Sequence, residues 1–293
     1  MKNKMKFITM MTLLVFGTTS FAKSIIPQVP KVIYGQDDRV DVYESNDNLM
    51  KELSRSTAAM ILNRNLTVTE AGYNLKSDTL EGSGMCRTER FASQPVAANC
   101  SGFLIAPDKL VTAGHCVSSD YECQNHAWVF DYTNRESEKK TFSFTKDQVY
   151  RCSKVIERKK DANTKSDYAV LKLERAVVNR SPLEYRTSGA PADDAVFTVI
   201  GHPTGLPTKI TAAAEMRNNH DPVYFVTNAD TYGGNSGSAV VDSRTGIVEG
   251  ILVRGDTDYA RTSEGCLASV HRPQNGGRGE DITRITVIEN LKQ

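Results

Sequence analysis

A long succession of short apolar segments restricts the fold more than any other feature of this sequence. Between residues 57 and 253, runs rich in Val, Ile, Phe, Tyr and Thr alternate with turns that contain Gly, Pro, Asn and Asp. Many short strands separated by turn residues are typical of an all-β barrel or sandwich. The predicted strands span residues 57–62, 101–106, 110–113, 128–132, 148–156, 169–173, 195–201, 209–215, 223–227, 239–242 and 246–253.

Two helices are predicted, one on each side of this β-rich region. The polar residues 45–47 offer N-cap side chains before Leu49 and Leu53, which predicts a short N-terminal helix over residues 47–54. Apolar residues recur at helical spacing in residues 281–291 and would form a wide apolar stripe, which predicts a C-terminal helix.

The first residues have the organisation of a secretory signal. Residues 1–6 carry three lysines, residues 7–16 are mostly apolar, and small residues lead up to Ala22. The apolar run is shorter than the about 20 residues that a membrane-spanning helix needs, which disfavours the alternative of an anchored helix. We therefore predict a signal peptide over residues 1–22, secretion to the periplasm or the extracellular medium, and no stable membrane insertion.

The segment after the predicted signal, residues 23–31 (KSIIPQVPK), is too short and too rich in proline to pack as a domain. It is either a pro-segment removed after Lys31 or an extended N-terminal arm. Residues 32–293 then form one domain. The polar, proline-containing stretch at residues 176–191 is the expected junction between its two halves.

Charge balance argues against a nucleic-acid partner. Lys plus Arg number 36 and Asp plus Glu number 35, so the net charge is only +1 and no global field attracts a polyanion. The charged stretch at residues 157–165 contains no aromatic side chain for base stacking, and we expect it to be a solvated loop.

No metal or cofactor is predicted. Six cysteines and five histidines show neither the CxxC nor the HxxxH spacing of zinc sites. Two acidic pairs, Asp37 with Asp38 and Glu280 with Asp281, lack the spacing of a calcium loop, and we expect them to be surface charge.

Three segments carry residue types suited to catalysis. LVTAGHC places His115 just after a strand, SDYAVLKL places Asp167 just before one, and DTYGGNSGSA places Ser236 in a glycine-rich loop. Each alone is compatible with ordinary turn chemistry. Together they supply a base, an orienting carboxylate and an alcohol nucleophile in a β-rich, exported chain.

The strings TAGHC, DxAxLxL and GNSGS, in this order, resemble the motifs of the chymotrypsin-like serine peptidases. The resemblance extends over about residues 32–290. It implies two six-stranded antiparallel β-barrels with the site between them, and a trypsin-like, monomeric enzyme that cleaves proteins or peptides. An α/β-hydrolase elbow is disfavoured because Ser238 stands where GxSxG requires glycine, and because that fold orders its triad differently.

The resemblance assigns roles to the three segments. Ser236 would attack the carbonyl, His115 would carry the proton, and Asp167 would orient the imidazole. The backbone N–H groups of Gly234 and Ser236 would form the oxyanion hole. These residues are also compatible with two alternative functions, a catalytically silent binding module and an esterase-like acyl hydrolase.

Within the family, the strings VIYGQDDR and GGNSGS are similar to the bacterial glutamyl endopeptidases. This similarity implies a zymogen that is cleaved between Lys31 and Val32. Asn235 replaces the aspartate that precedes the nucleophile in digestive members, so the ion pair with a new N-terminus cannot form in the same way. Leu252 stands near the histidine with which the glutamate-specific enzymes bind their substrate.

Asp230 falls where trypsin-like members carry the carboxylate of the primary specificity pocket, which implies cleavage after Arg or Lys. Thr231 would form a polar wall of that pocket. In the alternative interpretation, Asp230 caps a turn or pairs with Arg254, and the pocket is neutral or occluded. The same resemblance places the pocket edge at Leu252, Val253, Arg254 and Gly255.

The resemblance also implies one disulfide, between Cys100 and Cys116, which flank a predicted hairpin. The other cysteines, Cys86, Cys123, Cys152 and Cys266, allow three pairings, among which the sequence does not choose.

Overall fold

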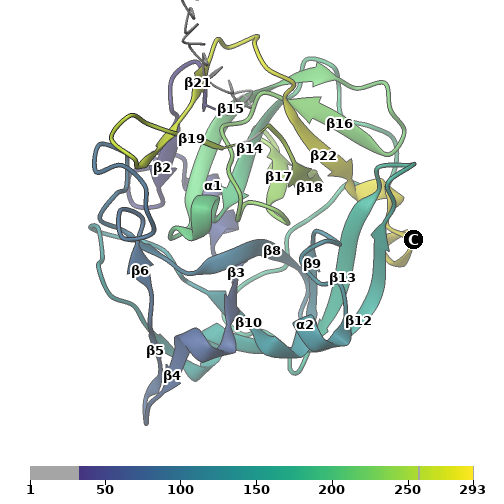
Figure 1. Cartoon of the computed structure of the whole chain (residues 1–293). Helices are drawn as coiled ribbons and strands as arrows, with labels where there is room; N and C mark the ends of the chain where they lie inside the picture. Colours follow the sequence, from purple (N-terminus) through teal and green to yellow (C-terminus); the bar gives the residue numbers. More distant parts are fainter. Residues whose placement is uncertain (1–32, 257, 293) are drawn as a thin grey trace, which may run out of the picture.

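The computed structural model describes residues 33–256 and 258–292. The signal peptide and pro-segment predicted for residues 1–31 lie outside this part of the chain. Two β-barrels form the body of the molecule, one built from the blue and teal strands and the other from the green and yellow strands of Figure 1. None of the described helices is long and apolar enough to cross a bilayer.

The first barrel is a closed ring of antiparallel strands in the order β10-β12-β13-β9-β8-β3. Its strands are β3 (Thr57–Leu62), β8 (Ala98–Ala106), β9 (Lys109–Thr112), β10 (His126–Phe130), β12 (Val149–Lys160) and β13 (Asp167–Leu173). Large side chains such as Phe103, Trp128 and Tyr150 are fully buried inside it.

The second barrel follows the order β14-β17-β18-β22-β16-β15, and pairing between β14 and β15 closes the ring. Its strands are β14 (Val196–Gly201), β15 (Lys209–Asn218), β16 (Tyr224–Thr227), β17 (Ala239–Asp242), β18 (Val248–Arg254) and β22 (Glu280–Arg284). Strand β2 (Arg39–Asp41) adds to the outside of β15. The prediction of two six-stranded antiparallel barrels is therefore confirmed.

Shorter strands decorate the barrels. Strands β4, β5 and β11 form a small sheet, and β1 with β21, β6 with β7, and β19 with β20 form pairs. Their bounds are β1 (Ile33–Tyr34), β4 (Leu66–Val68), β5 (Gly72–Leu75), β6 (Asp78–Thr79), β7 (Pro95–Val96), β11 (Ser143–Thr145), β19 (Tyr259–Arg261), β20 (Leu267–Ser269) and β21 (His271–Arg272). Single 3-10 turns occur at Asn63–Asn65, Lys146–Gln148 and Pro203–Gly205.

The short N-terminal helix forms as predicted. Helix α1 (Asn48–Ser54) begins after Asp47, whose carboxylate accepts hydrogen bonds from the backbone N–H groups of Leu49 and Met50 at 2.9 and 3.1 Å. A second helix, α2 (Asp120–Asn125), was not predicted; it begins after Ser119, whose hydroxyl accepts from Glu122 N.

The predicted C-terminal helix is wrong. Residues 280–284 form strand β22, which lies between β16 and β18, and only 3-10 turns at Ile285–Val287 and Glu289–Leu291 follow it. The apolar stripe is real, since Ile282, Ile285 and Leu291 are buried. Closure of the second barrel requires a strand here, and this tertiary requirement outweighs the helical periodicity.

The solvated loop predicted at residues 157–165 is also wrong in its first part. Strand β12 continues to Lys160, which is paired in register with Asp167 at the start of β13. Strand pairing uses only backbone groups, so the charged side chains at this end of β12 remain at the surface while the ladder extends. This longer strand brings Lys160 to the functional site.

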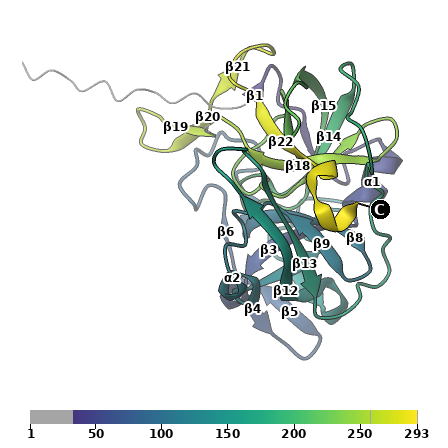
Figure 2. The same ribbon diagram turned by 90° about the vertical axis from the view of Figure 1, so that its right-hand side faces the viewer.

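The barrels share one packed core. A single cluster of buried residues includes Phe103 and Trp128 of the first barrel together with Ile200 and Ile251 of the second. Residues 174–195, which contain the predicted junction, connect β13 to β14. The yellow C-terminal segment of Figure 2 returns to the first barrel. There Asn290 donates from its backbone N–H and its side chain to Glu157 at 2.9 and 2.7 Å.

All six cysteines form disulfides. Cys100 pairs with Cys116, the bridge that the resemblance implied. Cys123 pairs with Cys152 between α2 and β12, and Cys86 pairs with Cys266 across a sequence separation of 180 residues. Such bridges are typical of exported proteins.

His202, at the end of β14, is fully buried and supports the structure. Its Nδ1 lies 3.0 Å from the carbonyl oxygen of Leu206, and its ring stacks on Tyr132 with centroids 5.6 Å apart. Burial lowers the pKa of His202 to about 4.

We predict that His202 makes stability fall as the pH drops from about 6.5 to about 4. In this window the unfolded chain binds a proton that the folded chain rejects, which costs up to about 1.4 kcal/mol per pH unit. Urea unfolding of wild type and His202→Gln at several pH values measures this effect. The difference in unfolding free energy between the two proteins should become smaller at low pH. If the unfolding free energies of the two proteins changed in parallel with pH, His202 would not be the group responsible.

Candidate active site

His115 and Asp167 form a close pair at the edge of the first barrel. His115 follows β9 and Asp167 begins β13, the strand next to β9. His115 Nδ1 lies 2.9 Å from Asp167 Oδ2, and the backbone N–H of His115 donates to Asp167 Oδ1 at 2.9 Å. The Asp167 side chain is 3% exposed and that of His115 is 29% exposed. The imidazole is thus held by a buried carboxylate while its far edge faces outward.

Lys160 is a member of this site that the sequence did not indicate. Its Nζ lies 3.1 Å from Asp167 Oδ2, the same oxygen that contacts His115. Burial alone would raise the pKa of Asp167, but the contacts with His115 and Lys160 outweigh burial and lower it. Asp167 is therefore ionised at neutral pH.

Ser236 lies on a loop of the second barrel that is fastened to the first. Gly234 and Gly237 have φ values of +92° and +91°, which favour glycine. A Cβ atom at position 237 would lie 2.0 Å from the carbonyl oxygen of Ser101 on β8. Ser101 donates from its hydroxyl to Gly234 O at 2.9 Å and from its N–H to Ser236 O at 2.8 Å.

The disulfide between Cys100 and Cys116 brings the loop and the imidazole together. A ring nitrogen of His115 lies within 4.8 Å of both sulfur atoms, and Cys116 Sγ lies 3.7 Å from the carbonyl oxygen of Ser236. Among the described residues, no hydrogen bond joins the Ser236 hydroxyl to His115. Contacts of this kind are often long before substrate binds.

Two amide groups beside Ser236 are unpaired. Asn235 N donates to Tyr232 O at 2.9 Å, and Gly237 N donates to Leu252 O at 2.7 Å. In the described part of the chain, the N–H groups of Gly234 and Ser236 have no hydrogen-bond acceptor. These two donors are available to an anionic oxygen.

A metal does not suit this cluster. Cys100, His115 and Cys116 are the described residues whose donor atoms gather at metal-binding distance. Both sulfur atoms are consumed by the disulfide, whereas a metal requires the thiolate.

A pocket of about 140 Å³ opens beside Ser236. Of the predicted pocket residues, Thr231, Leu252, Arg254 and Gly255 line it, whereas Val253 is buried in the core. The full lining is Thr231, Tyr232, Gly233, Ser236, Leu252, Arg254, Gly255, Asp256, Asp258 and Glu280.

Asp230 is not the carboxylate of this pocket, which corrects the prediction. Its Oδ1 accepts a hydrogen bond from Tyr34 N at 2.7 Å and its Oδ2 accepts one from Asp38 N at 3.3 Å. Asp230 therefore binds the backbone of the N-terminal segment and is not among the residues that line the pocket. The alternative partner is wrong as well, since Arg254 pairs with Asp281 at 2.7 Å.

The two acidic pairs expected at the surface are covered instead, since Asp37 and Asp38 are half-buried and Glu280 and Asp281 are buried. Asp37 forms an ion pair with Arg39 at 2.7 Å, and burial raises the pKa of Asp38, which lies next to Asp230. Glu280 and Asp281 are each 3% exposed. The sequence offered a signal only for the second pair, because Glu280 and Asp281 directly precede the apolar residue Ile282.

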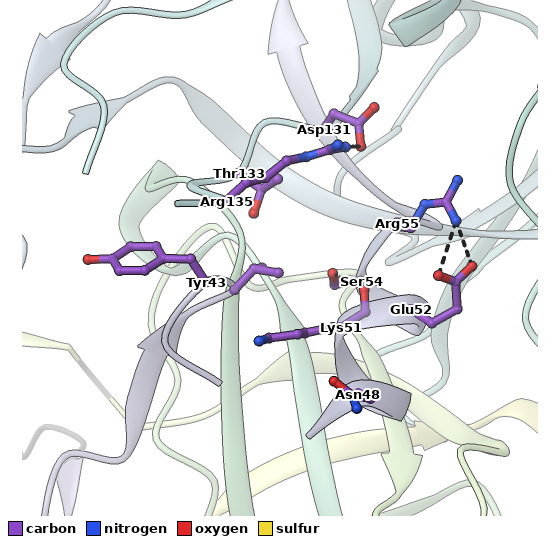
Figure 3. Close-up of a pocket in the computed structure, with 10 residues that line it drawn as sticks. Tyr43, Asn48, Lys51, Glu52, Ser54, Arg55, Asp131, Thr133 and Arg135 are labelled. Carbon is purple, nitrogen blue, oxygen red and sulfur yellow. Dashed lines mark hydrogen bonds and ion pairs between the residues drawn. The ribbon is translucent and has the colours of Figure 1, made fainter. Parts of the chain in front are cut away.

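A separate hollow of about 280 Å³ lies at α1, away from these groups. Four of its charged side chains form two ion pairs, Arg55 with Glu52 and Arg135 with Asp131 (Figure 3). We assign no chemistry to it.

Barrel architecture and sequence relationships together define the class of protein. The fold is that of a chymotrypsin-like serine peptidase, with the His115–Asp167 pair and Ser236 at the place where the barrels meet. A family model described as a trypsin-like peptidase domain matches residues 100–251. The chain therefore belongs to this family.

One relative and two solved structures illustrate the similarity. The extracellular metalloprotease of Bacillus subtilis (strain 168) is 30% identical over 206 residues, which cover 66% of this chain and 57% of that protein. A Glu endopeptidase structure gives a TM-score of 0.50 at 16% identity, covering 87% of this chain and 96% of that one. The Rv3671c protease in an inactive form gives 0.45 at 14% identity, covering 82% and 88%.

Proposed function

We propose that this protein is a secreted serine endopeptidase and cleaves peptide bonds through a His115, Asp167 and Ser236 triad. The observation that carries the proposal is the double contact between His115 and the buried Asp167 carboxylate. Nearby, the N–H groups of Gly234 and Ser236 have no acceptor among the described residues. The three disulfides and the extracellular relative support secretion.

The chemistry is acyl transfer. Ser236 Oγ attacks the substrate carbonyl while His115 Nε2 takes its proton, and the N–H groups of Gly234 and Ser236 stabilise the oxyanion. His115 then protonates the leaving amine, and water releases the acyl group by the same steps in reverse order. Asp167 fixes the tautomer by accepting from Nδ1 and stabilises the imidazolium.

We further propose a monomer that acts on proteins or peptides, prefers cleavage after Arg or Lys, and is made as a zymogen that is cut after Lys31. The basic preference is supported by the acidic lining of the pocket beside Ser236. The balanced total charge supports the absence of a nucleic-acid partner.

Incubation of the purified chain, beginning at Val32, with a peptide library tests the proposal. Mass spectrometry of the products reads the cleavage sites. Hydrolysis of internal peptide bonds is expected. Intact peptides together with rapid turnover of a simple ester would instead favour an acyl hydrolase, and no turnover of either would favour a silent binding module.

A further inference from the structure

The pocket beside Ser236 contains a buried carboxyl group that the sequence did not place there. Glu280, on β22, lines the pocket and is 3% exposed. Thr231 Oγ1 donates to its Oε2 at 2.6 Å, and Asp256 N donates to its Oε1 at 3.3 Å. Both donors are neutral. Among the described residues, no Lys, Arg or His forms an ion pair with Glu280.

Gly255 makes room for this carboxyl group. A Cβ atom at position 255 would lie 1.8 Å from Glu280 Oε2 and 2.0 Å from Oε1. The carboxyl group therefore lies directly against the backbone of the β18 end, which forms the pocket edge. Any larger residue at position 255 would displace it from the pocket.

The rest of the lining adds negative charge. Asp256 and Asp258 are also pocket residues, and Asp258 Oδ2 accepts from Gly233 N at 2.6 Å. Arg254 is the one cation among the described lining residues, and it pairs with Asp281 at 2.7 Å and donates to the carbonyl oxygen of Lys165 at 2.9 Å. A cation that enters the pocket would thus meet an excess of carboxyl groups.

Burial has a large effect on Glu280. It raises the pKa of this carboxyl group to about 8, and the nearby charge of Asp258 adds to the shift, while the Thr231 hydroxyl, the Asp256 N–H and the charge of Arg278 oppose it. A buried carboxyl group without a direct ion-pair partner is costly to ionise, and an ammonium or guanidinium group that entered the pocket would lower that cost.

We propose that Glu280 is the specificity-determining residue of this pocket and pairs with the Lys or Arg side chain that precedes the scissile bond. The inference rests on the proposed peptidase function, because the pocket adjoins the nucleophile of that mechanism. It differs from the sequence prediction, since the carboxyl group comes from β22 and not from Asp230.

Four peptides that differ only at the residue before the scissile bond, Arg, Lys, Gln or Glu, test the inference. The wild type should cleave the Arg and Lys peptides with the highest kcat/KM. The isosteric variant Glu280→Gln should lower the ratio of Arg to Gln cleavage by on the order of 10²-fold, because it removes one partner of a buried charge pair. The matched control Asp230→Asn removes the neighbouring buried carboxylate and should retain the wild-type ratio.

Several results would overturn the inference. The role of Glu280 would be rejected if Glu280→Gln kept the wild-type ratio of Arg to Gln cleavage, or if only Asp230→Asn lowered that ratio. Either result would leave the peptidase assignment intact. Preference of the wild type for Glu would indicate that Arg254 dominates the pocket. Failure of the wild type to cleave any peptide would reject the proposed function and this inference with it.

Discussion

Ser236→Ala is expected to lower kcat by about 10⁶-fold and to abolish acyl-enzyme formation. The substitution removes only the hydroxyl group, and the loop that carries it is held by hydrogen bonds from the hydroxyl and the N–H of Ser101 on β8. Stopped-flow kinetics with an activated ester substrate measures both the burst of acylation and the steady rate.

Two controls separate lost chemistry from lost structure. The midpoint of thermal unfolding of Ser236→Ala should remain close to that of the wild type. Ser238→Ala, which removes a buried hydroxyl of the same loop that contacts Asn235, should retain a burst. A burst in Ser236→Ala would mean that another residue is acylated.

Asp167→Asn is expected to lower kcat by about 10⁴-fold, because an amide does not hold the imidazole in the productive tautomer. Both oxygens of Asp167 contact His115, so the substitution changes the orientation of the ring as well as its electrostatics. Measurement of kcat on one good peptide substrate tests this.

The matched control is Asp161→Asn, in the exposed turn between β12 and β13. Within the described part of the chain, the Asp161 carboxylate accepts from the local backbone N–H groups of Asn163 and Thr164. Its replacement should leave kcat unchanged. A loss of less than tenfold in Asp167→Asn would show that Asp167 does not orient the base.

The sequence predicts the barrels well because each strand carries its own local signal. Short β-branched and aromatic runs bounded by turn residues indicate strands without knowledge of their partners. The strand at 280–284 was missed for the opposite reason. Its neighbours β16 and β18 are distant in sequence, and only their pairing makes a strand there more favourable than a helix.

The residues of the site also fall into two groups, those with a local sequence signal and those without one. His115, Asp167 and Ser236 were found because each lies in a short recognisable string. Lys160 and Glu280 have no such string. Lys160 reaches Asp167 through the register of β12 against β13, and Glu280 reaches the pocket through the closing strand of the second barrel. Asp230 was misassigned because a position in the chain does not determine the direction of a side chain.

Covalent labelling by an active-site-directed fluorophosphonate tests the central claim most directly. One equivalent should add to the chain beginning at Val32, and peptide mapping by mass spectrometry should locate the adduct on Ser236. Labelling should fall sharply in His115→Ala, since that variant lacks the base. Absence of an adduct on the native protein, or its location on another residue, would contradict the account.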